Sequence, residues 1–381
     1  MVTGIVRQKA KTLLQSDREL PSDGDLDVSA LIRTMRNVTN SYKHLLLRAI
    51  LKSAQKTEYG FVSYDELFYG MLEEAWWPAF HYRLSLGKSD KVVALLDSKI
   101  EDADELRVKP EDVPSLIRTI PFDRRRQRTT GLLRYVPQRL IVPWFEEDVK
   151  GTGKEDSLVP KLSVERFEAQ KPLYRMQEDG ITLHPDWLLH LQKWHSVFMG
   201  WSDAGWIAYL ESRNPHALSL FAKIKPAFER TPLVAQRRIW AEACSKIRVE
   251  CIYTGIQLDS AFFQLDHFYP HTFVGHDRFW NLTPTSPQIN LDKRERLPES
   301  EFLAPLAAQH AKLHGVAARL SDGARRDLVR MREDYAIDLG IDGRDCEDSA
   351  CLERAYRDSY RVLSGIAGRM GFSLNWRPTS W

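Results

Sequence analysis

The residues from Asp266 to Asn290 combine side-chain types and spacings that suit a hydrolytic site. Asp266 and His267 are neighbours, and Asn281 and Asn290 follow 14 and 23 positions after the histidine. A histidine that is neutral near pH 7 can take a proton from water as a general base. Carboxylate and amide oxygens, such as those of Asp266 and Asn290, are hard ligands of the kind that Mg²⁺ and Mn²⁺ prefer. The pattern therefore predicts a site that activates water beside a divalent cation.

Two short strands are expected to lead up to the Asp-His pair. Residues 250–258 and 261–267 each alternate between apolar and polar side chains, with a turn between them, so they predict a hairpin. Neighbouring side chains of a strand point to opposite faces. Asp266 and His267 therefore diverge unless the strand ends or bulges at this point, and Pro270 indicates that it does.

A helix is expected to complete this unit. Ser286 is a suitable N-cap and Pro287 suits the first helical position, so a helix is predicted to run to about Arg294. The order strand, strand, loop, helix packs the end of the second strand against the helix. Asn290 is then expected close to Asp266.

This combination resembles the ββα-metal fold of HNH endonucleases. The similarity covers residues 249–298 and is greatest to the zinc-free HNH domains of RNA-guided CRISPR nucleases, in which the asparagine spacings agree. Its fixed positions are Asp266, His267, Pro270, Thr272, Phe273, Asn281, Asn290, Lys293 and Pro298. The resemblance implies an endonuclease that hydrolyses the phosphodiester bonds of nucleic acid with the help of a divalent cation.

The resemblance also implies a role for each residue of the site. His267 is expected to be the general base, and Asn281 is expected to bridge the loop to the strand and orient that base. Asp266 and Asn290 are expected to hold Mg²⁺ or Mn²⁺. Three cations at the end of the helix are candidates for gripping substrate phosphates: Lys293, Arg294 and Arg296. For these three, ordinary solvated charges are an equally open alternative.

Structural zinc is not expected in this segment. Many members of the family carry Cys-x-x-Cys-Gly in the first strand, whereas this chain has Cys251 followed by Thr254 and Gly255. Because no second cysteine pair follows Asn290, a four-ligand zinc site cannot form here. Hydrophobic packing is expected instead, from Tyr253, Leu258, Phe262 and Trp280.

The rest of the chain is predicted to be helical, so the expected fold class is mainly α (α+β). Its length exceeds that of one ordinary domain, and we expect four regions. A helical N-terminal region covers 1–100, with a winged-helix-like module as one form that it could take. A mixed, mostly helical middle region with a basic patch covers 101–243. The nuclease domain covers 244–300, and a helical C-terminal region covers 301–381.

Composition limits the partners and the location. With 54 basic and 52 acidic residues the net charge is only +2, so any nucleic-acid surface must be a local patch. From Phe221 to Arg248 seven Lys and Arg outnumber two Glu, which makes this stretch the favoured approach to the site. The run from Arg124 to Arg128 is a second candidate, with a solvated loop as its alternative. Short apolar runs predict no membrane span, and few, irregularly spaced cysteines suggest a cytoplasmic protein.

Other candidate residues have plainer interpretations. His310 and His314 lie four apart on a predicted helix and could hold a metal, but without a third ligand we expect surface histidines. His271 and His276 flank the candidate site, where a substrate contact and a plain loop role are both open. The tryptophans between 187 and 206 are expected in a helical core rather than stacked on bases.

The favoured function is a Mg²⁺-dependent HNH endonuclease that nicks or cuts DNA in bacterial restriction or anti-phage defence. Its helical regions, a protein partner or a homodimer are expected to control it. Two alternatives stay open. One is a catalytically inactive HNH fold that serves as a nucleic-acid-binding or adaptor subunit, and the other is a nuclease directed at RNA.

Overall fold

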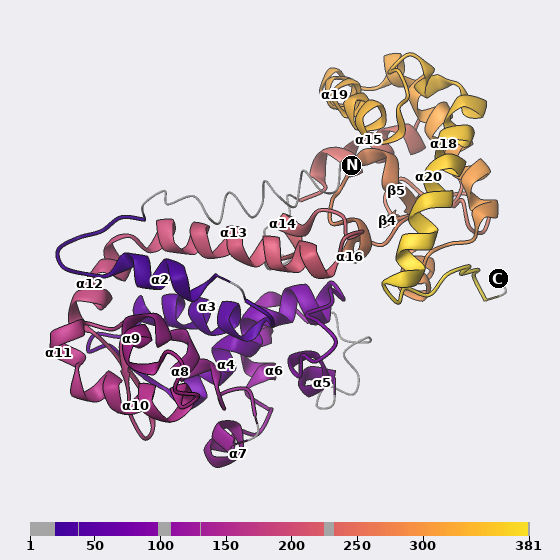
Figure 1. Ribbon diagram of the computed structural model, residues 1–381. Coiled ribbons are helices and arrows are strands. Elements are labelled where there is room, and N and C mark those ends of the chain that lie inside the picture. Colours follow the sequence, from indigo (N-terminus) through magenta and orange to yellow (C-terminus); the bar gives the residue numbers. More distant parts are fainter. Residues whose placement is uncertain (1–19, 37, 98–107, 130, 225–231, 380–381) are drawn as a thin grey trace. The chain divides into compact units, whose positions relative to one another are not determined.

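Helices dominate the structure, a computed structural model that describes residues 20–36, 38–97, 108–129, 131–224 and 232–379. Two small antiparallel sheets accompany the helices among the described residues (Figure 1), which confirms the mainly α (α+β) class. The chain divides into two compact units. The first unit comprises residues 1–215 and 223–228, and the second unit comprises residues 216–222 and 229–381.

The two units group together regions that the sequence separates. The N-terminal region and most of the middle region, up to residue 215, share the first unit. The expected nuclease region, residues 244–300, shares the second unit with the C-terminal helices.

The first unit packs its helices around a three-stranded antiparallel sheet. Its helices are α2 (Val28–Thr34), α3 (Tyr42–Ala54), α4 (Tyr64–Ala75), the π-helical η1 (Trp76–His81), α5 (Val92–Asp97), η2 (Pro110–Asp112), α6 (Val113–Ile117), α7 (Arg124–Thr129), α8 (Val136–Leu140), η3 (Val142–Phe145), α9 (Glu146–Val149), α10 (Glu155–Glu165), α11 (Phe167–Gln170), α12 (Pro185–Lys193) and α13 (His195–Arg213). Its strands are β1 (Phe61–Ser63), β2 (Tyr174–Met176) and β3 (Gly180–Leu183), in the order β1-β3-β2. Two of the three strands lie outside residues 1–100, so any winged-helix-like module extends beyond that region.

A buried ion cluster joins three helices of the first unit. Arg48 Nε on α3 lies 2.6 Å from Glu74 Oε2 on α4, and its Nη1 contacts Asp203 on α13. Arg48 and Glu74 are buried. Because a buried charge is costly without a partner, the cluster restricts how these helices can pack.

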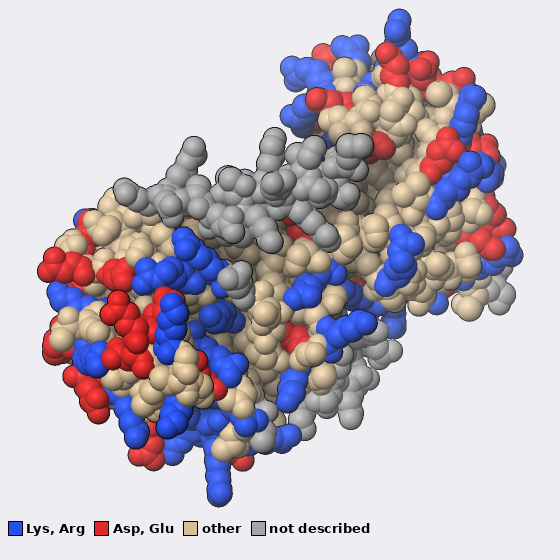
Figure 2. All heavy atoms as spheres, viewed as in Figure 1, with Lys and Arg blue, Asp and Glu red and all other residues tan. Residues whose placement is uncertain are grey.

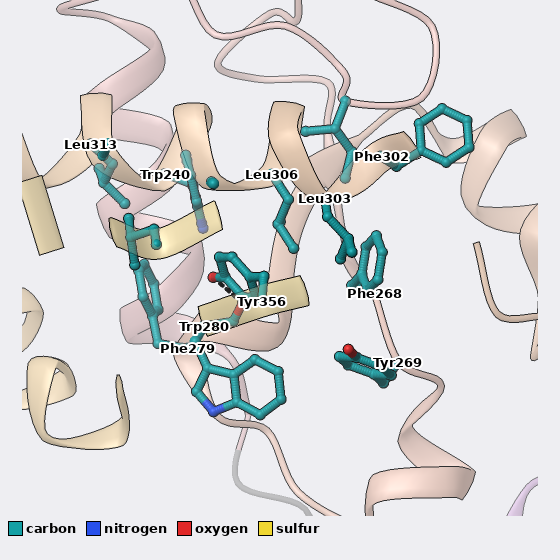
Figure 3. Close-up of a cluster of buried hydrophobic side chains, with 14 of the residues drawn as sticks. Trp240, Phe268, Tyr269, Phe279, Trp280, Phe302, Leu303, Leu306, Leu313 and Tyr356 are labelled. Carbon is teal, nitrogen blue, oxygen red and sulfur yellow. Dashed lines mark hydrogen bonds between the residues drawn. The ribbon is translucent and has the colours of Figure 1, made fainter. Parts of the chain in front are cut away.

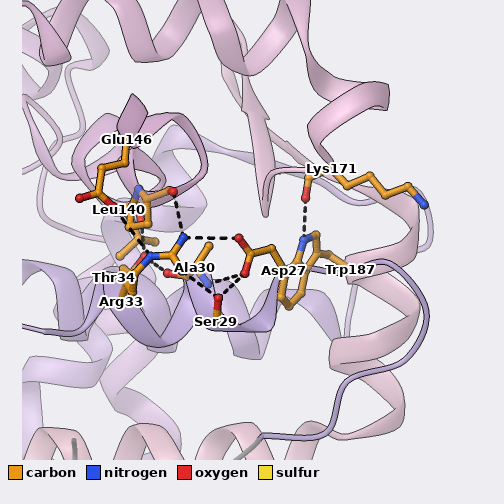
Figure 4. Close-up of polar contacts among 10 residues, drawn as sticks. Asp27, Ser29, Ala30, Arg33, Thr34, Leu140, Glu146, Lys171 and Trp187 are labelled. Atoms are coloured by element: carbon orange, nitrogen blue, oxygen red, sulfur yellow. Dashed lines mark hydrogen bonds and ion pairs between the residues drawn. The ribbon is translucent and has the colours of Figure 1, made fainter. Parts of the chain in front are cut away.

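Polar contacts hold helix α2 in the first unit (Figure 4). Asp27 caps the helix by accepting from the backbone N–H three residues on, at 2.9 Å. Thr34 Oγ1 donates to the carbonyl of Leu140 at 2.7 Å, and Arg33 Nη2 donates to the carbonyl of Pro143 at 3.2 Å. These bonds tie α2 to the segment from α8 to η3.

The second unit contains the sheet β4-β5 and a set of helices. Its strands are β4 (Gln264–His267) and β5 (Leu282–Thr285), and its helices are α15 (Val234–Cys244), α16 (His271–Val274), η5 (Phe279–Asn281), α17 (Pro287–Lys293), η6 (Ser300–Phe302), α18 (Leu303–Gly315), η7 (Ala317–Arg319), α19 (Asp322–Leu339), η8 (Asp345–Glu347) and α20 (Ser349–Arg369). The short helix α14 (Leu220–Lys223) spans the boundary between the units.

One hydrophobic cluster runs through the second unit (Figure 3). Trp240 of α15 stacks on Phe279 with ring centroids 6.0 Å apart. Leu306 of α18 and Tyr356 of α20 belong to the same cluster, and Tyr356 Oη donates to the carbonyl of Trp280 at 2.8 Å. Residues before and after the expected nuclease segment therefore supply much of its core.

His310 and His314 are buried, so the prediction of surface histidines was wrong. His310 Nε2 lies 3.1 Å from the carbonyl of Leu282 on β5, and its Nδ1 is hydrogen-bonded to Tyr335 Oη. Burial lowers the pKa of each imidazole to about 3. Their spacing reflects a helix face that packs on β5 and α19 rather than a metal site.

Surface charge is mixed in sign. Figure 2 shows Lys and Arg side chains among Asp and Glu over the visible face. In the arginine run, Arg124 pairs with Asp179 and the guanidinium of Arg128 lies 4.6 Å from the centre of the Tyr64 ring. Trp187 and Trp206 are fully buried, as expected for core residues, whereas Trp194 and Trp201 are half-buried. No helix in the described ranges is both long and apolar enough to span a bilayer.

Candidate active site

Strand β4 pairs with β5, which follows the loop, and not with the residues before it. The register places Asp266 opposite Thr283 and His267 opposite Leu282. The predicted partner, residues 250–258, contains only an isolated bridge between Glu250 and Gln257 and is otherwise a turn. The predicted hairpin was therefore wrong, and the observed order is strand, loop, strand and helix, with the loop between the two strands.

The turn at residues 251–256 explains why no first strand forms. Cys251 N donates to the carbonyl of Ile256 at 2.8 Å, and Gly255 N donates back to the carbonyl of Cys251 at 2.8 Å. Gly255 has φ of +69°, a left-handed conformation that glycine adopts without strain. Because the chain reverses direction within these few residues, it has no extended backbone that could form strand hydrogen bonds with β4.

Asp266 points into the domain from β4 and is only 3% exposed. Its Oδ2 accepts a hydrogen bond from Tyr253 Oη at 2.6 Å, and its Oδ1 lies 3.0 Å from Lys293 Nζ. Lys293 Nζ also donates to the carbonyl of His267 at 2.6 Å. Both oxygens of the carboxylate are thus engaged by groups of the same chain.

His267 lies at the end of β4 and is partly exposed, so it diverges from Asp266 as the alternation of a strand requires. Its Nε2 is 2.7 Å from Asp277 Oδ1. The His271 ring packs edge-on against it, with centroids 5.4 Å apart, and His271 Nε2 is 4.0 Å from the same Asp277 oxygen. The predicted base therefore has a carboxylate partner that the sequence analysis missed.

Asn281 fixes the chain just beyond His267. Its side chain is fully buried, accepts from Tyr269 N at 2.7 Å and donates to the carbonyl of Tyr269 at 2.9 Å. The backbone of Asn281 accepts from Phe268 N at 2.8 Å. A bridge between loop and strand was expected here. Any effect of Asn281 on His267 acts through this backbone, because the two side chains share no hydrogen bond in the described residues.

Asn290 and Lys293 each form a side-chain contact between α17 and β4. Asn290 Nδ2 donates to Gln264 Oε1 at 2.7 Å, one helical turn before the contact of Lys293 with Asp266. Gln264 and Asp266 share a strand face because they are two residues apart. Ser286 caps α17 by accepting from Ile289 N, as the sequence predicted. The helix therefore brings Asn290 to the face of β4 that carries Asp266.

Lys293, Arg294 and Arg296, the three residues expected to contact substrate phosphates, differ in exposure and in their partners. Lys293 has no exposed surface and its ammonium is paired with Asp266, which corrects the expectation that it faces the substrate. Arg296 pairs with Asp292 at 3.1 Å and lies over the Trp376 ring. Arg294 is exposed, with φ of +49° at the end of α17, and it remains a candidate for phosphate contact.

Residues 251–299 match the model of the HNH endonuclease family. The match covers β4, the loop, β5 and α17, and it includes every residue proposed for the site. This segment is an HNH-family domain. Comparison with curated proteins and with solved structures returned no match.

Aromatic and aliphatic side chains of the HNH domain pack around the turn that carries Cys251. Tyr253 lies against Phe302 and Trp376, with ring centroids 5.2 and 5.1 Å apart, and Leu258 and Trp280 are buried as expected. Phe262 is 78% exposed, so its predicted place in this packing was wrong. Cys251 Sγ lies 3.1 Å from Thr285 Oγ1 on β5.

The donor types around β4 and α17 fit a hard divalent cation such as HNH nucleases generally use. A carboxylate and an amide, those of Asp266 and Asn290, come to one face of the strand, and Mg²⁺ favours oxygen ligands of this kind. No cluster of three His, Cys, Asp or Glu suited to a metal occurs within the described ranges. For Asp266 to bind a cation, Lys293 must leave or share one of its oxygens.

The described residues of the expected basic approach from Phe221 to Arg248 lie only partly at the surface. Lys223 belongs to the first unit and is fully buried there, with its ammonium 6.0 Å from the centre of the Tyr82 ring. In the second unit Arg238 pairs with Asp327, and Arg237 donates to the carbonyl of Phe263. Residues 225–231 of this stretch lie outside the described residues. Among the described cations, Lys223 is therefore lost from the expected surface, whereas Arg237, Arg238, Lys246 and Arg248 are exposed.

A cavity of about 800 Å³ lies beside the loop that carries Asp277. Its walls come from the loop residues His276, Arg278 and Trp280 and from the facing sides of α19 and α20. Burial lowers the pKa of His276, which favours its neutral form. Neither His267 nor Asp277 lines the cavity, so it is distinct from the face of the loop that holds the base.

Proposed function

We propose that the chain is an endonuclease that hydrolyses phosphodiester bonds of DNA with Mg²⁺ as its cation. One observation carries the proposal. Within an HNH-family domain, His267 ends β4 partly exposed, with Asp266 buried beside it and Asn281 bracing the chain that follows. A partly exposed imidazole beside a buried carboxylate supports the proposal, because hydrolysis needs a base for water and a ligand for the cation.

His267 acts as the general base in the proposed mechanism. With the Nε2 proton donated to Asp277, the neutral imidazole keeps Nδ1 available to take a proton from water. Asp266 and Asn290 would hold the cation, which supplies stabilisation of the negative charge that develops on the phosphate. Arg294, exposed at the end of α17, would contact the phosphate backbone.

The choice of DNA over RNA, the role in restriction or anti-phage defence, and control by the helical regions or a partner come from the resemblance and from the extent of the chain outside the HNH domain. Four cysteines without disulfides support a cytoplasmic setting. RNA cleavage is an outcome of the test below.

A plasmid assay tests the proposal. Supercoiled plasmid and labelled RNA are incubated with the full chain and Mg²⁺ or Mn²⁺, beside His267→Ala and the control His216→Ala, an exposed histidine elsewhere in the second unit. We expect nicking by the wild type and the control, and a loss of about 100-fold or more in His267→Ala. Cleavage that persists in His267→Ala would overturn the assignment of the base.

One observation favours a second candidate, an HNH fold that binds nucleic acid without cutting it. The Lys293 ammonium already neutralises Asp266, the carboxylate that a cation would use. In this case wild type and His267→Ala bind DNA equally in a gel-shift assay and neither nicks it. Nicking by the wild type alone excludes this candidate.

A further inference from the structure

We infer that Asp277 is the positioning residue of His267, and that helix α19 holds Asp277 in place. The inference rests on the proposed function only where it concerns cleavage. It assigns a task to the helices beyond the HNH segment, because α19 lies outside residues 251–299. Sequence spacing did not single out Asp277, and the family match names no role for it.

The contact itself is short and partly shielded. Asp277 Oδ1 lies 2.7 Å from His267 Nε2, and the two side chains are 20% and 14% exposed. A carboxylate accepts hydrogen bonds and cannot donate one when ionised, so it selects the tautomer of His267 with the proton on Nε2. The proton-accepting nitrogen is then Nδ1, on the opposite side of the ring. Asp277 thus decides which ring nitrogen carries the proton and which can accept one.

The loop that carries Asp277 is fastened immediately after it. Arg278 Nη1 lies 2.7 Å from Asp334 Oδ1 on α19, and Phe279 N donates to the other oxygen of Asp334 at 3.1 Å. Trp280 Nε1 donates to Asp338 Oδ2 at 2.6 Å, one helical turn further along α19. Two carboxylates of one helix therefore bind three consecutive residues that follow Asp277.

The start of the loop is defined as well. Gly275 ends α16 with φ of +74°, a left-handed conformation that turns the chain toward Asp277. His271, on the first turn of α16, stands 4.0 Å from the same carboxylate oxygen. Asp277 is thus held between a fixed turn and the contacts with α19. Because the backbone on each side of Asp277 is held in place, its carboxylate keeps the His267 imidazole in one orientation before substrate binds.

Nitrogen NMR of the full chain tests the inference without any need for activity. The protein is labelled with ¹⁵N-histidine, and the His267 signals are assigned by their loss in His267→Ala. We expect wild-type His267 to carry its proton on Nε2. Asp277→Ala should shift both ring-nitrogen signals and populate the Nδ1-protonated tautomer, and Asp277→Leu, which also lacks an acceptor, should do the same if Ala perturbs folding. An unchanged His267 spectrum in the folded variants would overturn the inference.

The contribution of α19 has its own matched control. Asp334→Ala combined with Asp338→Ala removes the acceptors that hold the loop, and we expect the His267 signals to shift or broaden. Asp327→Ala changes the same helix, but Asp327 pairs with Arg238 instead. It should leave the His267 signals in place. Equal spectra for the double variant and Asp327→Ala would show that α19 does not hold Asp277.

Cleavage adds a second readout. Asp277→Ala should lower kcat by about 10- to 100-fold with KM nearly unchanged, as expected when a residue acts through the base rather than on substrate binding. If the wild-type chain cuts no nucleic acid, the proposed function fails, but the NMR comparison still decides whether Asp277 positions His267. If the chain cuts and Asp277→Ala cuts equally well, the positioning role is wrong.

Discussion

The ammonium of Lys293 lies 3.0 Å from Asp266 Oδ1, and neither side chain is more than 4% exposed. The same ammonium donates to the carbonyl of His267, so one buried lysine reaches both residues of the Asp-His pair. Burial lowers the pKa of Lys293, while the charge of Asp266 opposes that shift. The chain therefore carries its own cation at the carboxylate proposed to bind the metal.

Lys293→Met should strengthen the binding of a divalent cation. Removing the ammonium frees Asp266 Oδ1 and removes the repulsion between two cations at one carboxylate. We expect the affinity for Mn²⁺, measured by titration calorimetry, to rise by about tenfold, which corresponds to about 1.4 kcal/mol. Lys312→Met, an exposed lysine on α18, is the control and should change nothing. Weaker Mn²⁺ binding in Lys293→Met would mean that the lysine supports the site.

Asp266→Asn should destabilise the second unit by about 3–5 kcal/mol, because it leaves the Lys293 ammonium buried without an anionic partner. Adding Lys293→Met removes the stranded charge, so the double variant should be more stable than Asp266→Asn alone. Urea unfolding of the wild type, both single variants and the double variant gives the coupling energy of the pair. Simple additivity of the two changes would contradict a direct interaction.

Substitution of Asn281 should lower the free energy of unfolding, whereas substitution of Asn290 should mainly lower the affinity for a divalent cation. Asn281→Ala leaves the backbone N–H and carbonyl of Tyr269 without their partners inside the protein, at a cost of about 3 kcal/mol. Asn290→Ala alters a half-buried side chain, so unfolding should change by less than about 1 kcal/mol while Mn²⁺ affinity falls. Urea unfolding and calorimetry on both variants check this. A stable Asn281→Ala would be incompatible with the bridging role described above.

Acid should destabilise the second unit through His310 and His314. Both are neutral when folded, with pKa values lowered to about 3, whereas in the unfolded chain they titrate near 6.5. Between these values the unfolded chain binds more protons, so stability is lost as the pH falls below 6.5. The loss at pH 5 should be about 2 kcal/mol per histidine. Urea unfolding at pH 7 and pH 5 should show a smaller loss in His314→Gln than in the exposed control His216→Gln.

The parts of the site that were predictable from the sequence depend on local chemistry. The Ser286 cap and Pro287 fixed the start of α17, and the adjacency of Asp266 and His267 on a strand fixed their divergence. The strand partner could not be read in this way. Strand β5 is only four residues long, is buried throughout and contains Pro284, so its pairing with β4 depends on tertiary packing.

Three further features depend on contacts between distant segments. Lys293 looks like an ordinary solvated cation at the end of a helix, and only the approach of α17 to β4 buries it. The burial of His310 follows from β5 and α19, and the role of Asp277 follows from a loop fastened to α19. No spacing rule along the chain connects positions 277 and 334. Such contacts between distant segments depend on the tertiary fold and cannot be predicted from the residues of the motif alone.

The core shared by Trp240, Phe279 and Tyr356 has a practical consequence for protein engineering. An HNH segment cut out at residues 251 and 299 would expose the apolar faces that α15, α18 and α20 now cover, and it would aggregate or unfold. Fusion proteins that use this HNH domain should therefore include the whole second unit. Random recombination within that unit should yield few soluble chimaeras, whereas crossovers near residue 215 should be tolerated.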